Sequence, residues 1–401
     1  MKIRCLYKSF CIGVFLLALF PFPRVWAFAD ELAKGNNAFA FDLFQHLGKQ
    51  SGNIFVSPFS ISTALAMTFA GSRTETAKEM GTVLHLPKDK VHPLFKALLE
   101  SLDGRDKPYQ LHVANALWGR KGSEFLPGFL SGVEEFYHGK LQKMDFAGDT
   151  EGARQAINKW VEEKTEQKIK ELLIPGILSP ETKLVLTNAI YFKGTWLNTF
   201  EKDLTKDQDF FTASGTTQKV PLMEMTAQCL FLEEKDFQAL ELPYTGKDLS
   251  MVVLLPRTKD GLPALEATLS QPRWQEILTR LAPETDVQIF LPRFKVTLAM
   301  FLGETLQALG MKLAFGNADF SGIDGTKSMS ISEVIHKAFV EVNEEGTEAA
   351  AATAVEMSDS FQPEGPKPAP VFRADHPFFF VIRHKPTDSI LFMGRLASPT
   401  Q

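Results

Sequence analysis

The chain lacks the sequence motifs of the common enzyme classes. It contains no G-x-S-x-G, H-E-x-x-H, G-x-G-x-x-G or Walker-type glycine–lysine loop, and no two of its eight histidines stand three or four residues apart. The 43 lysines and arginines do not exceed the 48 aspartates and glutamates, so no basic excess favours a nucleic-acid partner. The sequence therefore favours neither an enzyme nor a metal or cofactor site.

Cysteine is nearly absent. Cys5 and Cys11 lie in the first 27 residues, and Cys229 is alone in the rest of the chain. A lone cysteine excludes an intramolecular disulfide beyond residue 27, so this part must be stabilised by its core. The composition allows this, because 44% of the 401 residues are hydrophobic and 23% are charged, as in globular domains.

A basic and apolar leader occupies residues 1–27. Basic residues near the start precede an apolar run that begins at Phe10, and the small residues Val25 and Ala27 precede a candidate cleavage site. The apolar run is too short to span a bilayer. We therefore expect a signal peptide that is cleaved near Ala27 and a secreted, extracellular or periplasmic single domain over 28–401, with no membrane segment in the mature form.

Hydrophobic periodicity predicts helices in the first half of the chain and strands mostly later. Ser57 or Ser60 is a candidate N-cap for a helix that has Pro58 in its first turn. This order favours an α+β class over a regular βαβ array. The predicted segments are helices over 40–47, from 58 and over 153–161, and strands over 184–192, 251–255, 287–291, 378–382 and 390–393.

The segment from Gly346 to Pro370 contains no stretch typical of a core. It begins alanine-rich and ends proline-rich, which is unusual inside a compact domain. Within Thr347–Met357, alternate residues from Thr347 are all small or apolar, and both glutamates lie on the other face. This pattern fits a strand buried on one face, although four consecutive alanines favour a helix. An alanine-rich linker is the alternative interpretation.

A series of motifs in chain order resembles the serpin family of serine protease inhibitors. The motifs are NIFVSPFSI at 53–61, NKWV at 158–161, NAIYFKGTW at 188–196, DFSG at 319–322, EVIHKAFVEVNEEGTEAA at 333–350, FRADHPFFF at 372–380 and ILFMGR at 390–395. The resemblance implies the serpin fold, which is α+β with three β-sheets, about nine helices and an exposed reactive-centre loop, here at about 344–371. Gln167 departs from the glycine common in the family and predicts a local loop change.

The resemblance also implies a mechanism. A target serine protease of chymotrypsin-, elastase- or subtilisin-like type acylates the loop, the loop inserts into the central sheet, and the protease is trapped in a covalent complex. Such a protein is a suicide substrate, expected to be monomeric and without a cofactor, rather than an enzyme. The alternatives are a non-inhibitory carrier or chaperone, an inhibitor of cysteine proteases, and a hydrolase on an unrelated fold, for which no nucleophile constellation is present.

Individual roles follow from the resemblance, position by position. The expected hinge residues are Glu344, Gly346, Thr347, Ala349, Ala350, Ala351 and Ala352. Two residues are expected where the sheet opens: Arg293, which pairs with the hinge glutamate, and Trp196, at the point where the loop first enters. A polar cluster is expected beneath the central strands that must open, and its members are Ser57, Ser60, Asn188 and His336. The inward face of the hinge carries no charge and no proline, which favours an inhibitory serpin.

The expected reactive bond is Ser360–Phe361, counted from the hinge by family spacing. A serine on the acyl side indicates an elastase-like protease with a small pocket. The bond Phe361–Gln362 would suit a chymotrypsin- or cathepsin-like pocket, and Met357–Ser358 is a third option that shortens the insertable strand. The target protease stays open at this level.

Overall fold

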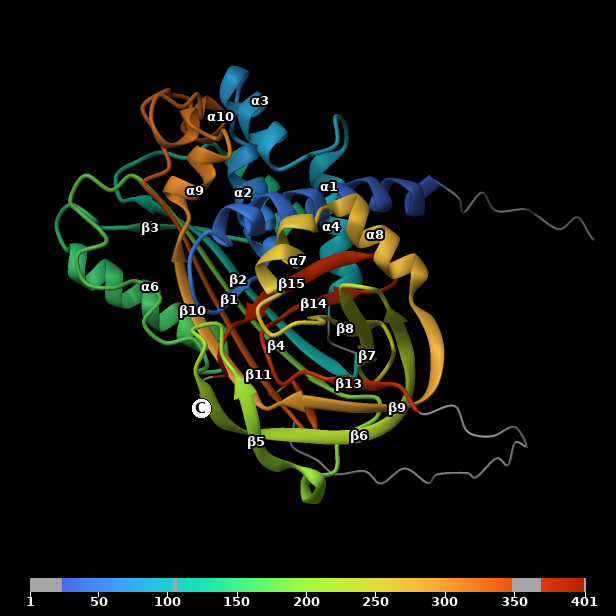
Figure 1. Ribbon diagram of the computed structural model, residues 1–401. Helices are drawn as coiled ribbons and strands as arrows, with labels where there is room; N and C mark the ends of the chain where they lie inside the picture. Colours follow the sequence, from blue (N-terminus) through green and yellow to red (C-terminus); the bar gives the residue numbers. More distant parts are fainter. Residues whose placement is uncertain (1–23, 104–106, 348–368, 400–401) are drawn as a thin grey trace, which may run out of the picture.

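Ten α-helices and two β-sheets form the described part of the chain, residues 24–103, 107–347 and 369–399, in a computed structural model (Figure 1). The α+β class is confirmed, and the helix number is close to the nine expected. The helices are α1 Arg24–Leu47, α2 Pro58–Phe69, α3 Thr74–Val83, α4 Val91–Leu102, α5 Pro127–Tyr137, α6 Thr150–Lys164, α7 Leu262–Thr268, α8 Gln271–Arg280, α9 Gly303–Ala308 and α10 Ser321–Asp324.

A six-stranded sheet, called here the central sheet, runs through the middle of the molecule (Figure 1). Its middle strands β4 and β11 are parallel, and each has an antiparallel neighbour on its other side. The strands, in spatial order, are β10 Phe294–Phe301, β11 Glu333–Asn343, β12 Gly346–Thr347, β4 Leu184–Thr195, β2 Tyr109–Arg120 and β3 Leu141–Met144.

A second sheet contains nine strands. Hydrogen bonds join its strands continuously, so the described residues form two sheets where three were expected. The reason is the length of β6, which pairs with β5 near its start and with β7 near its end, and pairs with β9 along its other edge. The strands are β1 Ile54–Val56, β15 Ser389–Leu396, β14 Phe378–His384, β8 Leu249–Pro256, β7 Phe237–Pro243, β6 Thr217–Glu233, β9 Ala282–Pro292, β13 Val371–Arg373 and β5 Lys206–Phe211.

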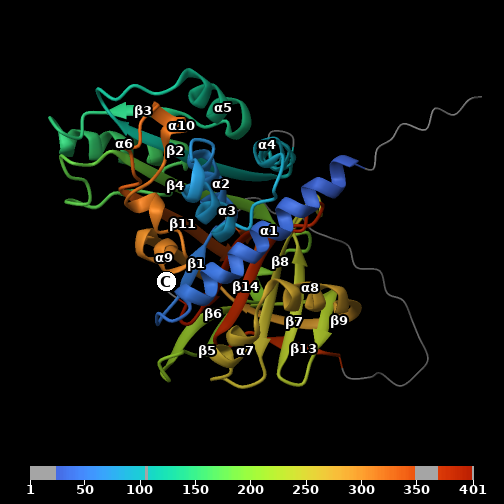
Figure 2. The same cartoon turned by 90° about the horizontal axis from the view of Figure 1, so that it is seen from above.

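Helix α2 lies between the two sheets and contacts both β4 and β15 (Figure 2). It begins where predicted: the Ser57 side chain accepts a hydrogen bond from the Ser60 amide, and Pro58 occupies the first turn, where a missing N–H costs nothing. Nearly every residue of α2 is buried, including its serines and threonines, because the helix is packed on all sides.

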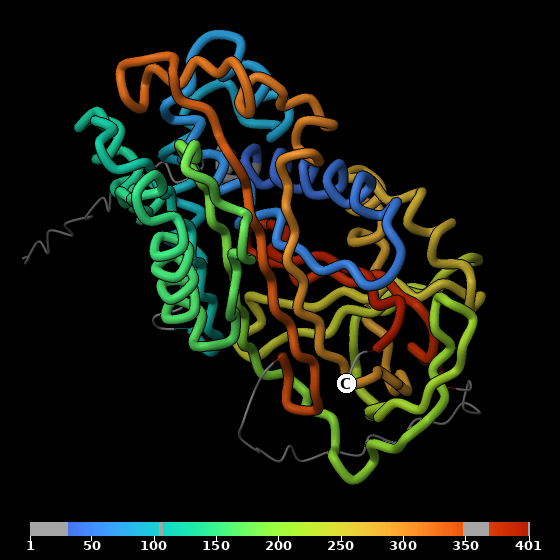
Figure 3. Tube along the Cα trace, turned by 90° about the vertical axis from the view of Figure 1, so that its left-hand side faces the viewer, coloured from blue at the N-terminus to red at the C-terminus, as the bar shows by residue number. Residues whose placement is uncertain are grey.

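Helix α6 covers the opposite face of the central sheet, and Figure 3 shows it lying alongside the long strands. Helical spacing predicts a buried face of Ala153, Ala156, Ile157, Trp160 and Val161. Ala153, Ile157 and Val161 are buried and Trp160 is half-buried, but Ala156 is exposed. The three buried residues belong to a cluster that includes Trp118 on β2 and Ile335 on β11. The central sheet is therefore covered by apolar clusters on both faces, which agrees with the prediction that the strand at 184–192 is apolar on both faces.

The ends of the chain bear on two predictions. Helix α1 begins at Arg24, so a cut after Ala27 would remove its first turn, and the rest of the predicted leader lies outside the described residues. No helix in the described residues is long and apolar enough to cross a bilayer.

Gln167, just after α6, has φ +61°, a conformation that glycine adopts more easily.

Candidate functional site

The candidate site begins where β4 and β11 separate. These two parallel strands pair directly from Val185 opposite Glu333 to Tyr191 opposite Phe339. Beyond this point the short strand β12 lies between them, with Thr347 opposite Val342 on one side and Gly194 on the other. The expectation of an exposed loop without core character is therefore wrong for its first residues, because flanking strands bury Gly346 and Thr347.

A tight turn connects β11 to β12 and reverses the chain. The Asn343 side-chain oxygen accepts hydrogen bonds from the amides of Glu345 at 3.0 Å and Gly346 at 3.2 Å. Gly346 has φ +152°, and a Cβ there would lie 2.1 Å from the carbonyl oxygen of Gly194. Only glycine fits this position, because a side chain would collide with β4 backbone as well as strain the dihedral.

The Glu344 side chain, which belongs to this turn, is fixed by hydrogen bonds from Arg293 and Thr205. Its carboxylate oxygens accept from the Arg293 Nε–H at 2.7 and 2.8 Å and from the Thr205 hydroxyl at 2.5 Å. Burial pushes the pKa of Glu344 upward, but the hydrogen bonds from Arg293 and Thr205 outweigh it, so the pKa lies below its ordinary value. The pairing of Arg293 with the hinge glutamate, expected from the sequence, is present in the structure.

Trp196 lies against the turn between β11 and β12, where β4 and β11 separate. Its indole Nε1–H donates to the Asn343 carbonyl at 3.0 Å, and its backbone amide donates to the Glu345 carbonyl at 2.9 Å. The ring stacks on Tyr244 with a centroid distance of 4.5 Å. Trp196 is thus both a buried core aromatic and a direct contact of the turn that precedes β12.

A buried polar cluster lies lower in the central sheet, at the start of α2. His336 Nε2 accepts from the Ser57 amide at 3.1 Å, and its Nδ1 faces the Asn188 side-chain oxygen. The Asn188 amide donates to the Ser60 hydroxyl and to the Asn115 side-chain oxygen. The structure thus brings together the four polar residues predicted from the sequence and adds Asn115, which pairs with Asn188 across β2 and β4.

His336 is neutral in this cluster. Complete burial lowers its pKa to about 3, because the charged imidazolium loses its hydration. The Ser57 amide is a donor, so Nε2 must be unprotonated and Nδ1 carries the proton that faces Asn188. His336 therefore joins α2 to the two central strands as a structural hydrogen-bond partner, as expected, rather than as a base.

The remaining predicted residues lie outside the described part of the chain. These are Ala349, Ala350, Ala351, Ala352, Ser360 and Phe361. Their roles in the hinge and the reactive bond stay predictions.

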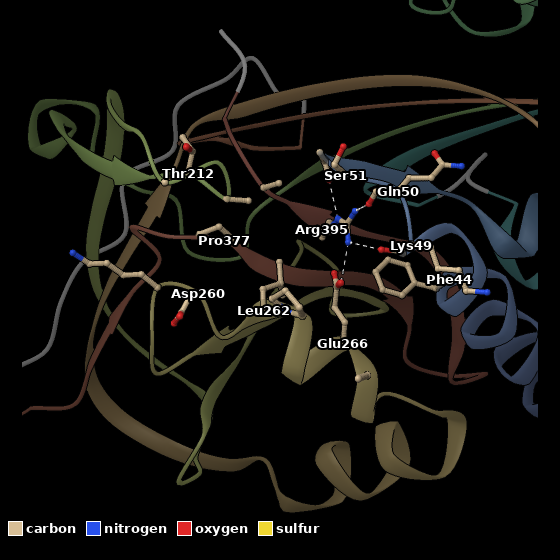
Figure 4. A pocket seen from close by; sticks show the side chains of 18 of the residues that line it. Phe44, Lys49, Gln50, Ser51, Thr212, Asp260, Leu262, Glu266, Pro377 and Arg395 are labelled. Carbon is tan, nitrogen blue, oxygen red and sulfur yellow. Dashed lines mark hydrogen bonds and ion pairs between the residues drawn. The ribbon is translucent and has the colours of Figure 1, made fainter.

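A cavity of about 800 Å³ lies apart from this site, between the end of α1, α7 and the end of β15 (Figure 4). At its floor Arg395 donates to a Glu266 oxygen at 3.0 Å and to the carbonyls of Gly48 and Gly52. Both charged side chains are about nine-tenths buried. The ionic groups at this floor join β15 to α7 and to the loop after α1, which is a structural role.

Two observations concern reactive groups elsewhere in the described residues. Burial raises the pKa of Cys229 to about 12, so its thiol is a poor nucleophile. No group of three or more histidine, cysteine, aspartate or glutamate side chains in residues 24–103, 107–347 and 369–399 could hold a metal ion.

Comparison with known proteins identifies the family. Residues 34–399 match the serpin (serine protease inhibitor) family. The chain is 45% identical over 384 residues to leukocyte elastase inhibitor from Bos taurus, covering 92% of this chain and all of that protein. Among solved structures, Serpin48 from the insect Tenebrio molitor shares 32% identity with a TM-score of 0.83, over 92% of this chain and 98% of that one. Human thyroxine-binding globulin has a TM-score of 0.85 at 31% identity, over 93% and 100%. The chain therefore belongs to the serpin family.

Proposed function

We propose that this serpin is a secreted suicide-substrate inhibitor of serine proteases. A target protease attacks the reactive-centre loop and becomes acylated on it. The loop then inserts between β4 and β11 as a new strand of the central sheet and carries the protease with it. The distorted protease cannot complete hydrolysis and stays covalently bound.

The observation that supports this most directly is the position of β12. Gly346 and Thr347 already lie between β4 and β11, antiparallel to both strands. A strand continued from Thr347 in the same direction would follow the line along which β4 and β11 now pair directly. Insertion would therefore exchange one strand-to-strand ladder for two.

The energy of this exchange is sufficient for trapping. About ten new backbone hydrogen bonds, at roughly 1 kcal/mol each, would form along an inserted loop. Burial of Val355 and Met357 would add roughly 1.5–3 kcal/mol each. A reserve on the order of 10 kcal/mol follows, which is comparable with the whole 5–15 kcal/mol stability of a typical native protein.

The target is inferred from the loop sequence. The proposed reactive bond is Ser360–Phe361, which suits an elastase-like protease with a small pocket, and Phe361–Gln362 and Met357–Ser358 are the other options. Similarity to a leukocyte elastase inhibitor agrees with an elastase-like target. Secretion rests on the predicted signal peptide at 1–27, and amino-terminal sequencing of exported protein that begins at Phe28 would support it.

The direct test mixes the mature protein with elastase-, chymotrypsin-, trypsin- and subtilisin-like proteases. A complex that survives denaturing electrophoresis is expected with at least one of them, and sequencing the released carboxyl-terminal peptide identifies the reactive bond. A cysteine protease of the cathepsin type serves as a parallel sample. Cleavage by several proteases without any stable complex would contradict the inhibitory mechanism.

The second candidate function is a non-inhibitory carrier. It is favoured by the cavity of about 800 Å³ beside α7, which is large enough for a drug-sized molecule, and by the fold shared with thyroxine-binding globulin. A carrier would be cleaved in the loop without forming a complex. The electrophoresis experiment therefore separates the two functions.

A further inference from the structure

The hydroxyl of Tyr244 contacts Thr347, a predicted hinge residue that lies inside the central sheet. Tyr244 Oη lies 2.7 Å from Thr347 Oγ1, and both side chains are completely buried. Thr347 also pairs through its backbone with β11 and β4. The Tyr244 contact therefore adds a side-chain anchor to the backbone pairing of Thr347.

The Tyr244 ring is fixed by its neighbours. It follows β7, forms an isolated bridge to Trp196, and stacks on the indole with an interplanar angle of 14°. Phe192 meets the ring edge-on at a centroid distance of 5.1 Å. Gly194 leaves room for it, because a Cβ at that position would approach Tyr244 Cδ1 to 3.0 Å. The Tyr244 ring is thus held by Trp196 and Phe192 in a position that places its hydroxyl against Thr347.

The Tyr244 and Thr347 hydroxyls are hydrogen-bond partners of each other. Burial raises the pKa of Tyr244, so the phenol stays protonated and either hydroxyl can donate to the other. A buried hydroxyl that loses its partner carries a desolvation penalty, so withdrawal of Thr347 from the sheet would leave the Tyr244 hydroxyl unsatisfied. The inserted position of Thr347 is therefore favoured over a withdrawn one.

We propose that Tyr244 is a positioning residue that holds the hinge pre-inserted at Thr347 and so promotes further insertion of the loop. The functional part rests on the proposed inhibitory mechanism. After acylation, insertion of the loop competes with deacylation of the protease. The first step of insertion is the least favourable, because backbone dihedral angles must be ordered before any ladder hydrogen bonds form. Since Thr347 is already paired, the chain does not have to pass through this step. Loss of the anchor should therefore divert more of the protein into simple cleavage.

The chain offers a matched control for removing one tyrosine hydroxyl. Tyr109 is also buried, and its hydroxyl has no partner among the described residues. Tyr244→Phe and Tyr109→Phe remove the same atom from a buried ring, but only the first breaks a contact with the hinge. Thr347→Val removes the hydroxyl from the other side, and Thr347→Ser keeps it.

Hydrogen exchange measures the anchor without any protease. Peptides that cover 340–347 should exchange about fivefold faster in Tyr244→Phe and in Thr347→Val, because one hydrogen bond shifts an opening equilibrium by about that factor. The double variant should show less than the product of the two single effects, and Tyr109→Phe and Thr347→Ser should match the wild type. Unchanged exchange in Tyr244→Phe, or independent effects of the two variants, would overturn the proposal.

The protease experiment tests the functional part. The number of inhibitor molecules consumed per trapped protease should rise in Tyr244→Phe and stay unchanged in Tyr109→Phe. If every inhibitor molecule trapped one protease, this number would be one, and the amount by which it exceeds one should rise by up to about fivefold. Faster exchange with unchanged consumption would overturn the role in insertion. If the wild type traps no protease at all, the proposed function fails, whereas the exchange data still decide whether Tyr244 anchors the hinge.

Discussion

The Arg293 Nε–H lies 2.7 and 2.8 Å from the two carboxylate oxygens of Glu344, which is the last acidic residue but one before β12. The Glu344 side chain is only 3% exposed, whereas Arg293 is 42% exposed. The buried carboxylate depends on this partner and on Thr205, because so little of it is exposed to solvent. The pair joins the end of β9 to the turn that starts the hinge.

Glu344→Gln should lower the unfolding midpoint by a few degrees, corresponding to about 1–3 kcal/mol. The glutamine amide would point a donor at groups that are themselves donors. Since the folded pKa of Glu344 lies below 4.5, its contribution is present above that pH and is lost as pH falls through the folded pKa. Thermal unfolding of both proteins between pH 7 and pH 3 should therefore converge at the acid end.

A control for the Glu344 experiment is available next to it. Lys202 pairs with Glu345, but the lysine side chain is 63% exposed. Lys202→Met should change the unfolding midpoint little, because exposed ion pairs contribute about 0–1 kcal/mol. Equal losses in Lys202→Met and Arg293→Met would contradict a special role for the Glu344 pair.

His336 should make the folded protein sensitive to mild acid. Its pKa is about 3 when folded and near 6.5 when unfolded, so the unfolded chain takes up a proton in this window and the folded protein does not. Stability should fall as pH drops below about 6.5, by at most about 1.4 kcal/mol per pH unit from this group. Urea unfolding at pH 7 and pH 5 measures the difference.

His336→Asn should be less stable at pH 7 and show a smaller loss between pH 7 and pH 5. The matched control is His138→Asn, since His138 is exposed and its φ of +51° is one that asparagine tolerates. That control should keep the wild-type pH dependence. A wild-type loss that survives in His336→Asn would assign the acid sensitivity to other groups.

Thr347→Arg should turn the inhibitor into a substrate. Thr347 is completely buried between β4 and β11, and burial of a guanidinium in that position would carry a large desolvation cost. The cleaved form should accumulate and the denaturant-stable complex should disappear on gels. Asn198→Arg places the same charge at an exposed position two residues after Trp196 and should leave the yield of complex unchanged.

Gly346→Ala should force the hinge out of its place between the strands. The new Cβ would lie 2.1 Å from the Gly194 carbonyl oxygen and 2.7 Å from Thr195 Cα, so the backbone must move. Faster hydrogen exchange over 340–347 and a lower unfolding midpoint are expected. Gly132→Ala, in the interior of α5 with no atom within 4 Å of the new Cβ, should instead stabilise by about 0.5–1 kcal/mol.

The sequence by itself was sufficient for the elements whose signals are local. The helix start at Ser57-Pro58 depends on a cap and a first-turn proline, and the buried face of α6 depends on helical spacing, so both were predicted and are confirmed. The motif resemblance also led to the Arg293–Glu344 pair, to Trp196 and to the polar cluster around His336. Apart from Arg293, each of these residues stands within one of the quoted motifs, which makes it recognisable from its neighbours.

Only the tertiary structure decided which distant side chains complete the site. Asn115, Thr205 and Tyr244 carry no local pattern, and each hydrogen-bonds a predicted residue from a distant part of the chain. Strand register places Asn115 directly opposite Asn188, whereas Thr205 and Tyr244 reach their partners through the packing of neighbouring segments. The distance over which neighbouring strands stay paired decides two further features. It determines whether Gly346 and Thr347 are buried, and it determines whether the strands form two sheets or more. A local sequence determines whether a segment can be a strand, but the strands that pack beside it determine whether that segment lies in a sheet or in a loop.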